Sequence, residues 1–120
     1  ERRNCDMQMG LYDQPFEAIK SGEKTIEVRL NDEKRSQLQV NDFIDFTNLT
    51  TGETLRVKVL SLEKFATFKE LFAKYSGSII GAPENESIEE LDQENQEIYS
   101  CEREQKYGAL AIKIEKITNS

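Results

Sequence analysis

Short segments in which apolar residues alternate with polar ones recur along this chain, and they constrain its fold more than any other feature. The alternation is clearest between Thr25 and Leu30, where Ile26, Val28 and Leu30 share one face and polar residues share the other. A period of two residues is that of a β-strand with one buried face. Strands of a doubly wound parallel sheet are instead continuously apolar, so the pattern favours a mostly antiparallel sheet or barrel.

Further strands are expected at residues 7–11, 42–49, 54–62 and 110–114, with residues 50–53 as a hairpin turn. Helices are expected from Pro15 to a stop at Gly22, as a short turn over residues 32–38, and after the cap residues Thr67 and Ser87. The last helix would carry Ile88, Leu91 and Ile98.

These elements predict an α+β fold, a small β-barrel of five to six mostly antiparallel strands with about three packed helices. A length of 120 residues suits a single domain spanning 1–120, in which residues 1–5 either join the fold or stay disordered.

The residues that are rare or missing narrow the chemistry. There is no histidine, which removes Ser-His-Asp and Cys-His catalysis and every His-ligated metal site. The two cysteines, Cys5 and Cys101, are too few for a disulfide framework or a zinc site and are expected as reduced thiols. We expect no metal and no other cofactor. With no basic-then-apolar leader and no apolar run near the ~20 residues of a membrane span, we expect a cytoplasmic protein without membrane contact.

Negative charge is concentrated in one segment. The chain has 23 acidic and 16 basic residues, a net charge of −7, which argues against a general nucleic-acid coat. Residues 82–105, however, hold nine acids against Arg103 alone, a net −8, so the remainder carries +1. The objection to nucleic acid therefore applies to one helical segment, and weak, site-limited RNA contact is still open.

The densest polar group follows the expected helix stop at Gly22. Residues two apart on a strand lie on one side roughly 6.5–7 Å apart, so Glu27 and Arg29 could share a ligand or pair with each other. An exposed strand face with a weak ion pair is the simpler interpretation. Lys24 would be a base if desolvated, or an anion binder if Glu27 holds it charged.

The run around these residues resembles the signature of the ASCH domain, named for activating signal cointegrator homology. The resemblance covers about residues 7–117 and is carried by Gly22-x-Lys24-Thr25-x-Glu27-x-Arg29, Pro15-Phe16-x-Ala18-Ile19, Asn31-Asp32-Glu33-Lys34-Arg35, Val40-x-Asp42, Tyr99-Ser100 and Lys106-Tyr107-Gly108.

This resemblance implies a PUA-like β-barrel with a cleft beside the signature run, and an RNA-binding or RNA-processing module. The RNA or nucleotide ligand would be bound by Lys24, Thr25, Glu27, Arg29, Ser100 and Tyr107. Lys34, Arg35, Arg56 and Lys58 would guide phosphates if they border the cleft.

An alternative is a small hydrolase acting on a modified nucleoside of the N4-acylcytidine type or on RNA. Its catalytic residues would be Lys24, Glu27 and Ser100. One branch of the family is a deacetylase whose threonine nucleophile falls three residues after the motif lysine, and another is assigned ribonuclease activity. This chain has Glu27 at the threonine position, which puts the deacetylase mechanism in doubt. Whether the protein is an enzyme stays open.

A third possibility is a protein-interaction module that binds a partner through the acidic helix within residues 84–98, as the coactivator association of the family name suggests. The sequence does not give the oligomeric state.

Overall fold

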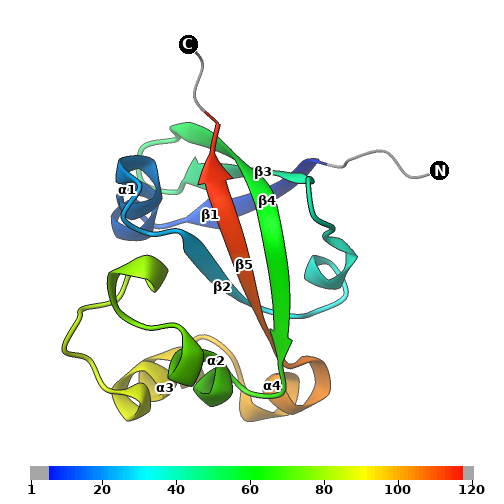
Figure 1. The fold of residues 1–120 in the computed structure, drawn as a ribbon, viewed down its shortest axis with the longest axis vertical. Coiled ribbons are helices and arrows are strands. Elements are labelled where there is room, and N and C mark those ends of the chain that lie inside the picture. Colours follow the sequence, from blue (N-terminus) through cyan, green and yellow to red (C-terminus); the bar gives the residue numbers. More distant parts are fainter. Residues whose placement is uncertain (1–5, 118–120) are drawn as a thin grey trace.

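The computed structural model describes residues 6–117, so Cys5 and the question of how residues 1–5 fold lie outside the description. Figure 1 shows a curled sheet with helices gathered mainly at one end. The elements, in chain order, are β1 (Asp6–Leu11), α1 (Asp13–Ser21), β2 (Ile26–Leu30), a 3-10 turn (Arg35–Gln37), β3 (Phe43–Asn48), β4 (Thr54–Phe65), α2 (Phe68–Lys74), a second 3-10 turn (Gly77–Ile80), α3 (Ile88–Gln96), α4 (Cys101–Tyr107) and β5 (Ala109–Lys116).

The described strands form one five-stranded sheet in the order β1-β3-β4-β5-β2. β1 pairs with β3 in parallel, and the other three pairings are antiparallel. The sequence expectation of an α+β, PUA-like barrel of mostly antiparallel strands is therefore confirmed, in the form of a curled half-barrel. Four α-helices lie within the described residues, where about three were expected; α4 is the one without a clear sequence pattern.

β4 is longer than the segment expected from alternation, and its length explains the curl. Its first part pairs with β3, and the part from Val57 to Phe65 pairs with β5. A register shift between Val59 and Ser61 marks a β-bulge, which bends a strand and increases its twist. One continuous strand thus serves both halves of the barrel.

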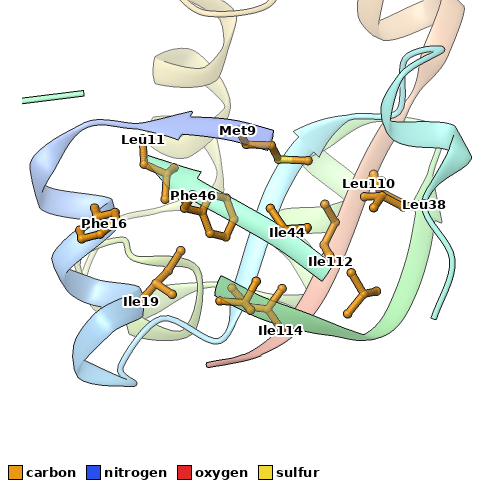
Figure 2. Close-up of a cluster of buried hydrophobic side chains, with 12 residues drawn as sticks. Met9, Leu11, Phe16, Ile19, Leu38, Ile44, Phe46, Leu110, Ile112 and Ile114 are labelled. Atoms are coloured by element: carbon orange, nitrogen blue, oxygen red, sulfur yellow. The ribbon is translucent and has the colours of Figure 1, made fainter. Parts of the chain in front are cut away.

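The larger hydrophobic cluster fills the concave side of the sheet, as Figure 2 shows. α1 closes one end of this side by placing Phe16 and Ile19 against Phe46 and Ile114. Phe16 and Phe46 are both fully buried. The helix ends where expected, because Gly22 adopts a left-handed conformation with φ 90° and donates its N–H to Ile19 O. α1 therefore connects the two edge strands and packs on the core at the same time.

A second cluster lies on the other face of β2 and β5. It joins Ile26 and Leu30 to Phe68 and Leu71 of α2 and to Leu91 of α3. The expected caps are confirmed: the Thr67 hydroxyl accepts from Glu70 N at 3.1 Å, and Ser87 and Glu90 form a capping box.

The expectation for Ile98 is wrong: α3 ends at Gln96, and Ile98 is 71% exposed. Tyr99, and not Ile98, packs against the second cluster, with its ring stacked on Phe68 at a centroid distance of 5.3 Å. Cys101 is a free, exposed cysteine. Among the helices described, none is long and apolar enough to cross a membrane.

Candidate functional site

β2, which carries Glu27 and Arg29 of the signature run, is covered on both faces. Its apolar residues Ile26 and Leu30 belong to the second cluster. Its polar residues Glu27 and Arg29 lie opposite Ile112 and Leu110 of β5, which belong to the larger cluster on the concave side. Directly opposed residues of an antiparallel pair point to the same face. The polar face of this strand therefore faces the barrel interior, and an exposed strand face is ruled out.

Glu27 is the centre of a buried ion network. Its carboxylate accepts from Lys24 Nζ at 2.6 Å through Oε1 and from Arg29 Nε at 2.5 Å through Oε2. The side chains of the three residues are 3%, 8% and 14% exposed for Glu27, Lys24 and Arg29, respectively. Both carboxylate oxygens thus have a cationic partner inside the fold.

The electrostatic balance keeps this carboxylate ionised. Burial by itself raises the pKa of Glu27, because it penalises the charged form. The charges of Lys24 and Arg29 and their hydrogen bonds act in the opposite direction and prevail, so the pKa lies below the ordinary glutamate value. The network is therefore one anion between two cations.

Arg29 links the two edges of the half-barrel. Its Nη2 donates to Gly10 O of β1 at 2.9 Å, while Arg29 itself belongs to β2 at the other edge of the sheet. Lys34, which follows β2, donates to Gln8 O at 3.2 Å. β1 is an edge strand, so no further strand pairs with its outer carbonyl groups. The side chains of Arg29 and Lys34 provide hydrogen bonds to two of these carbonyls instead. Glu27 orients Arg29, which bridges the two edge strands.

Lys24 is held by α1 and by the segment that follows α2. Thr25 N donates to Ile79 O at 2.9 Å, and Lys24 N donates to Ala18 O at 3.0 Å. Gly81 has φ 82°, and a methyl group there would lie 2.9 Å from Lys24 Cδ. Glycine at this position lets the loop cover the lysine stem. The stem is therefore buried between the 3-10 turn and the sheet.

Two hollows flank the turn between α1 and β2. The first, of about 330 Å³, is called the lysine hollow here because Lys24, Lys113 and Lys116 line it together with Thr25. The second, of about 520 Å³, lies between α1 and the loop 78–83 and is called the α1 groove. The α1 groove is lined by Gln14, Glu17, Ala18, Ser21, Glu23, Ser78, Gly81, Ala82 and Pro83.

Comparison with known proteins places this arrangement in a family. A family model for the ASCH domain matches residues 9–118. The chain belongs to the ASCH domain family. This family is PUA-like and is suggested to bind RNA. No curated protein matches the chain.

Solved structures agree with this family. Hypothetical protein PH0355, known from a crystal structure, is 41% identical with a TM-score of 0.82, over 93% of this chain and 99% of that one. Protein PF0455 from Pyrococcus furiosus, solved in solution by NMR, is 37% identical with a TM-score of 0.75, over 95% of this chain and 99% of that one. An ASCH protein of Zymomonas mobilis, crystallised as a mutant, is 14% identical with a TM-score of 0.58, over 94% of this chain and 73% of that one, and shows the fold alone.

The residues expected to bind a ligand in this ASCH domain fall into two groups. Lys24 and Thr25 line the lysine hollow, and Glu27 and Arg29 form the buried network behind it. The fold does not bring Ser100 or Tyr107 to these four residues.

The strand register explains this separation. Ile26 pairs with Lys113 at one end of β2, while Leu30 pairs with Ala109 at the other end, next to α4. The two ends of a five-residue strand are about 13 Å apart.

Ser100, the N-cap of α4, and Tyr107, its last residue, each have a local structural role. The Ser100 hydroxyl accepts from Arg103 N at 3.2 Å as the N-cap of α4. The Tyr107 ring packs at the margin of the second cluster, and its hydroxyl lies 3.5 Å from Glu33 Oε1.

Sequence reasoning missed Lys113 and Lys116. Both sit in an ordinary alternating strand, where lysine usually marks a solvated face. Only the pairing of β2 with β5 brings Lys113 beside the signature run. No local signal in the sequence indicates that pairing.

Proposed function

We propose that this ASCH domain binds single-stranded RNA or a nucleotide at the lysine hollow, with Lys24, Thr25, Lys113 and Lys116 forming the contact surface. The observation that carries the proposal is the meeting of three lysines at one hollow in a protein of net charge −7. Phosphate groups are the part of a nucleic acid that lysine side chains contact most often. The suggested RNA binding of the family supports the same ligand class.

The local charge supports weak binding rather than tight binding. Lys24 is neutralised by Glu27, and Glu115 also lines the hollow. Lys113 and Lys116 against Glu115 leave a local charge of 1 + 1 − 1 = +1. A site that neutralises few phosphates has modest affinity and a shallow salt dependence.

The α1 groove would take the base of the same nucleotide. Gln14, Ser21 and Ser78 offer hydrogen-bonding groups there, while Glu17 and Glu23 repel phosphate. The two hollows lie on either side of the turn that carries Gly22 and Glu23. A nucleotide bound across this turn would place its phosphate on the lysines and its base in the groove.

Binding is better supported than hydrolysis. A lysine that acts as a base must be neutral, and Lys24 is paired at 2.6 Å with a carboxylate whose pKa is lowered. Both oxygens of Glu27 accept from a buried cation, and the lowered pKa of Glu27 makes it a weaker proton acceptor than an ordinary glutamate. Ser100, the tentative nucleophile, is committed to the cap of α4. Of the three catalytic residues that the hydrolase alternative names, none is therefore an activated base or nucleophile in this arrangement.

The test is a titration of a single-stranded RNA pool by fluorescence anisotropy at several salt concentrations. Lys113→Ala should weaken binding and reduce the slope of log K against log salt by about one, since each lysine releases one counterion. Lys69→Ala, an exposed lysine on α2, is the matched control and should leave binding unchanged. Absence of binding at low salt, or equal effects of the two substitutions, would refute the proposal.

A further inference from the structure

Arg56 on β4 is held in place by side chains from β3 and β1. Its Nε and Nη2 donate to the two carboxylate oxygens of Asp45 on β3 at 2.9 and 3.0 Å. Nη2 also donates to Asp6 on β1 at 2.8 Å. The ring of Phe43 lies beneath the guanidinium, 5.2 Å from Cζ to the ring centroid. The guanidinium is therefore a planar group fixed in orientation, with one face already covered.

A hollow of about 590 Å³ lies beside this group and shares no lining residue with the lysine hollow or the α1 groove. Arg56 lines it and Phe43 does not, so the side of the guanidinium away from Phe43 is the one available to a ligand. Leu55 and Ile117 supply apolar walls, and Ile117 N is fixed by a 3.0 Å hydrogen bond to Arg56 O. This volume is in the range of small-molecule sites, about 300–1,000 Å³.

Three polar side chains line the same hollow: Gln8, Thr47 and Thr54. Within residues 6–117 none of the three is bonded through its side chain, whereas Asp45 and Arg56 are bonded to each other. An amide and two hydroxyls can both donate and accept hydrogen bonds. They can therefore match the mixed donor and acceptor edge of a ring.

The net charge of Arg56 and its two carboxylate partners disfavours an anion as the ligand of this hollow. Asp6 and Asp45 carry two negative charges against the single positive charge of Arg56, a local charge of 1 − 2 = −1. The hydrogen bonds that Arg56 donates to Asp45 and Asp6 raise the pKa of Arg56, so the guanidinium stays charged but is outnumbered by the two carboxylates. Such an arginine offers its flat face rather than its charge.

We infer that this hollow is a binding site for a planar nitrogen heterocycle, a free nucleobase or nucleoside, stacked on the Arg56 guanidinium. Arginine planes stack on bases, and the polar side chains of Gln8, Thr47 and Thr54 would bond the ring edge. The site is separate from the proposed RNA contact at the lysine hollow.

The experiment is a titration of the ¹⁵N-labelled chain with adenosine, monitored through the Arg56 Nε–H and the backbone amides of Thr47 and Thr54. Saturable shifts of these signals are expected, and ribose alone should cause none. Arg56→Lys keeps the charge but loses the plane and should weaken adenosine binding about tenfold. Arg103→Lys, an exposed arginine on α4, is the matched control and should change nothing.

Two further comparisons keep the inference open to refutation. Thr54→Val keeps the side-chain volume while removing a hydroxyl, so it should weaken adenosine binding even if Arg56→Lys proves unstable. Adenosine monophosphate should bind no tighter than adenosine, because the local charge is negative. Tighter binding of the monophosphate, unchanged binding by both variants, or shifts confined to Lys113 and its neighbours would overturn the inference. The last result would leave the proposed RNA contact intact.

Discussion

Replacing Glu27 by glutamine tests whether the buried ion network holds the half-barrel together. Glu27→Gln keeps the size of the side chain but removes the charge between Lys24 and Arg29. Two cations that are 8% and 14% exposed would then lie inside the fold without an anion. Removing one partner of a buried ion pair costs about 3–5 kcal/mol, because the other charge stays desolvated. We expect a loss of that size in the free energy of unfolding.

The assay is unfolding in urea followed by circular dichroism, since the chain has no tryptophan to report by fluorescence. The corresponding fall in melting temperature is roughly 10–20 °C for a domain of this size. Glu63→Gln is the matched control. It removes a carboxylate that pairs with Lys74 at 2.7 Å, but the two side chains are 36% and 54% exposed, so the effect should be far smaller.

The dependence on pH gives the same test a second readout. The pKa of Glu27 is lower in the folded state, so its stabilising effect is fully present above the ordinary glutamate pKa of about 4.3. It is lost as pH falls through the lower folded-state pKa. The stability difference between the wild type and Glu27→Gln should therefore be largest near neutrality and shrink in acid. A difference below about 0.5 kcal/mol, or one that does not change with pH, would refute the reasoning.

Two further predictions concern residues that hold loops and turns in place. Gly81→Ala and Gly52→Ala both place alanine at φ 82°, which costs about 1–2 kcal/mol, but only at Gly81 would the methyl group meet Lys24 Cδ, at 2.9 Å. In urea unfolding Gly81→Ala should lose more, and the excess should disappear in a Lys24→Ala background; equal losses would contradict this. Asn48 is 1% exposed, donates to Asp13 Oδ1 at 2.9 Å and accepts from the hairpin amides of residues 50 and 51. Asn48→Ala should therefore lower the free energy of unfolding by about 2–3 kcal/mol in the same assay. A loss below about 0.5 kcal/mol would contradict this role of Asn48.

Local patterns in the sequence were sufficient for most elements of the fold. Alternation located the strands because successive side chains of a strand point to opposite faces, and the glycine at 22 and the caps at Thr67 and Ser87 located helix ends because they satisfy terminal backbone groups. The signature run identified the family, which the match over residues 9–118 confirms. Ile98 was misplaced because its spacing continues a helix that in fact ends at Gln96.

The sequence by itself determined which residues are chemically equipped to act: one carboxylate with a lysine three residues before it and an arginine two residues after it. Only the tertiary structure decided what surrounds them. The pairing of β2 with β5 turns Glu27 and Arg29 toward the core, brings Lys113 beside the signature run, and leaves Ser100 at the far end to cap a helix. Such long-range pairing depends on the packing of both faces of the sheet together, and no window of neighbouring residues contains that information.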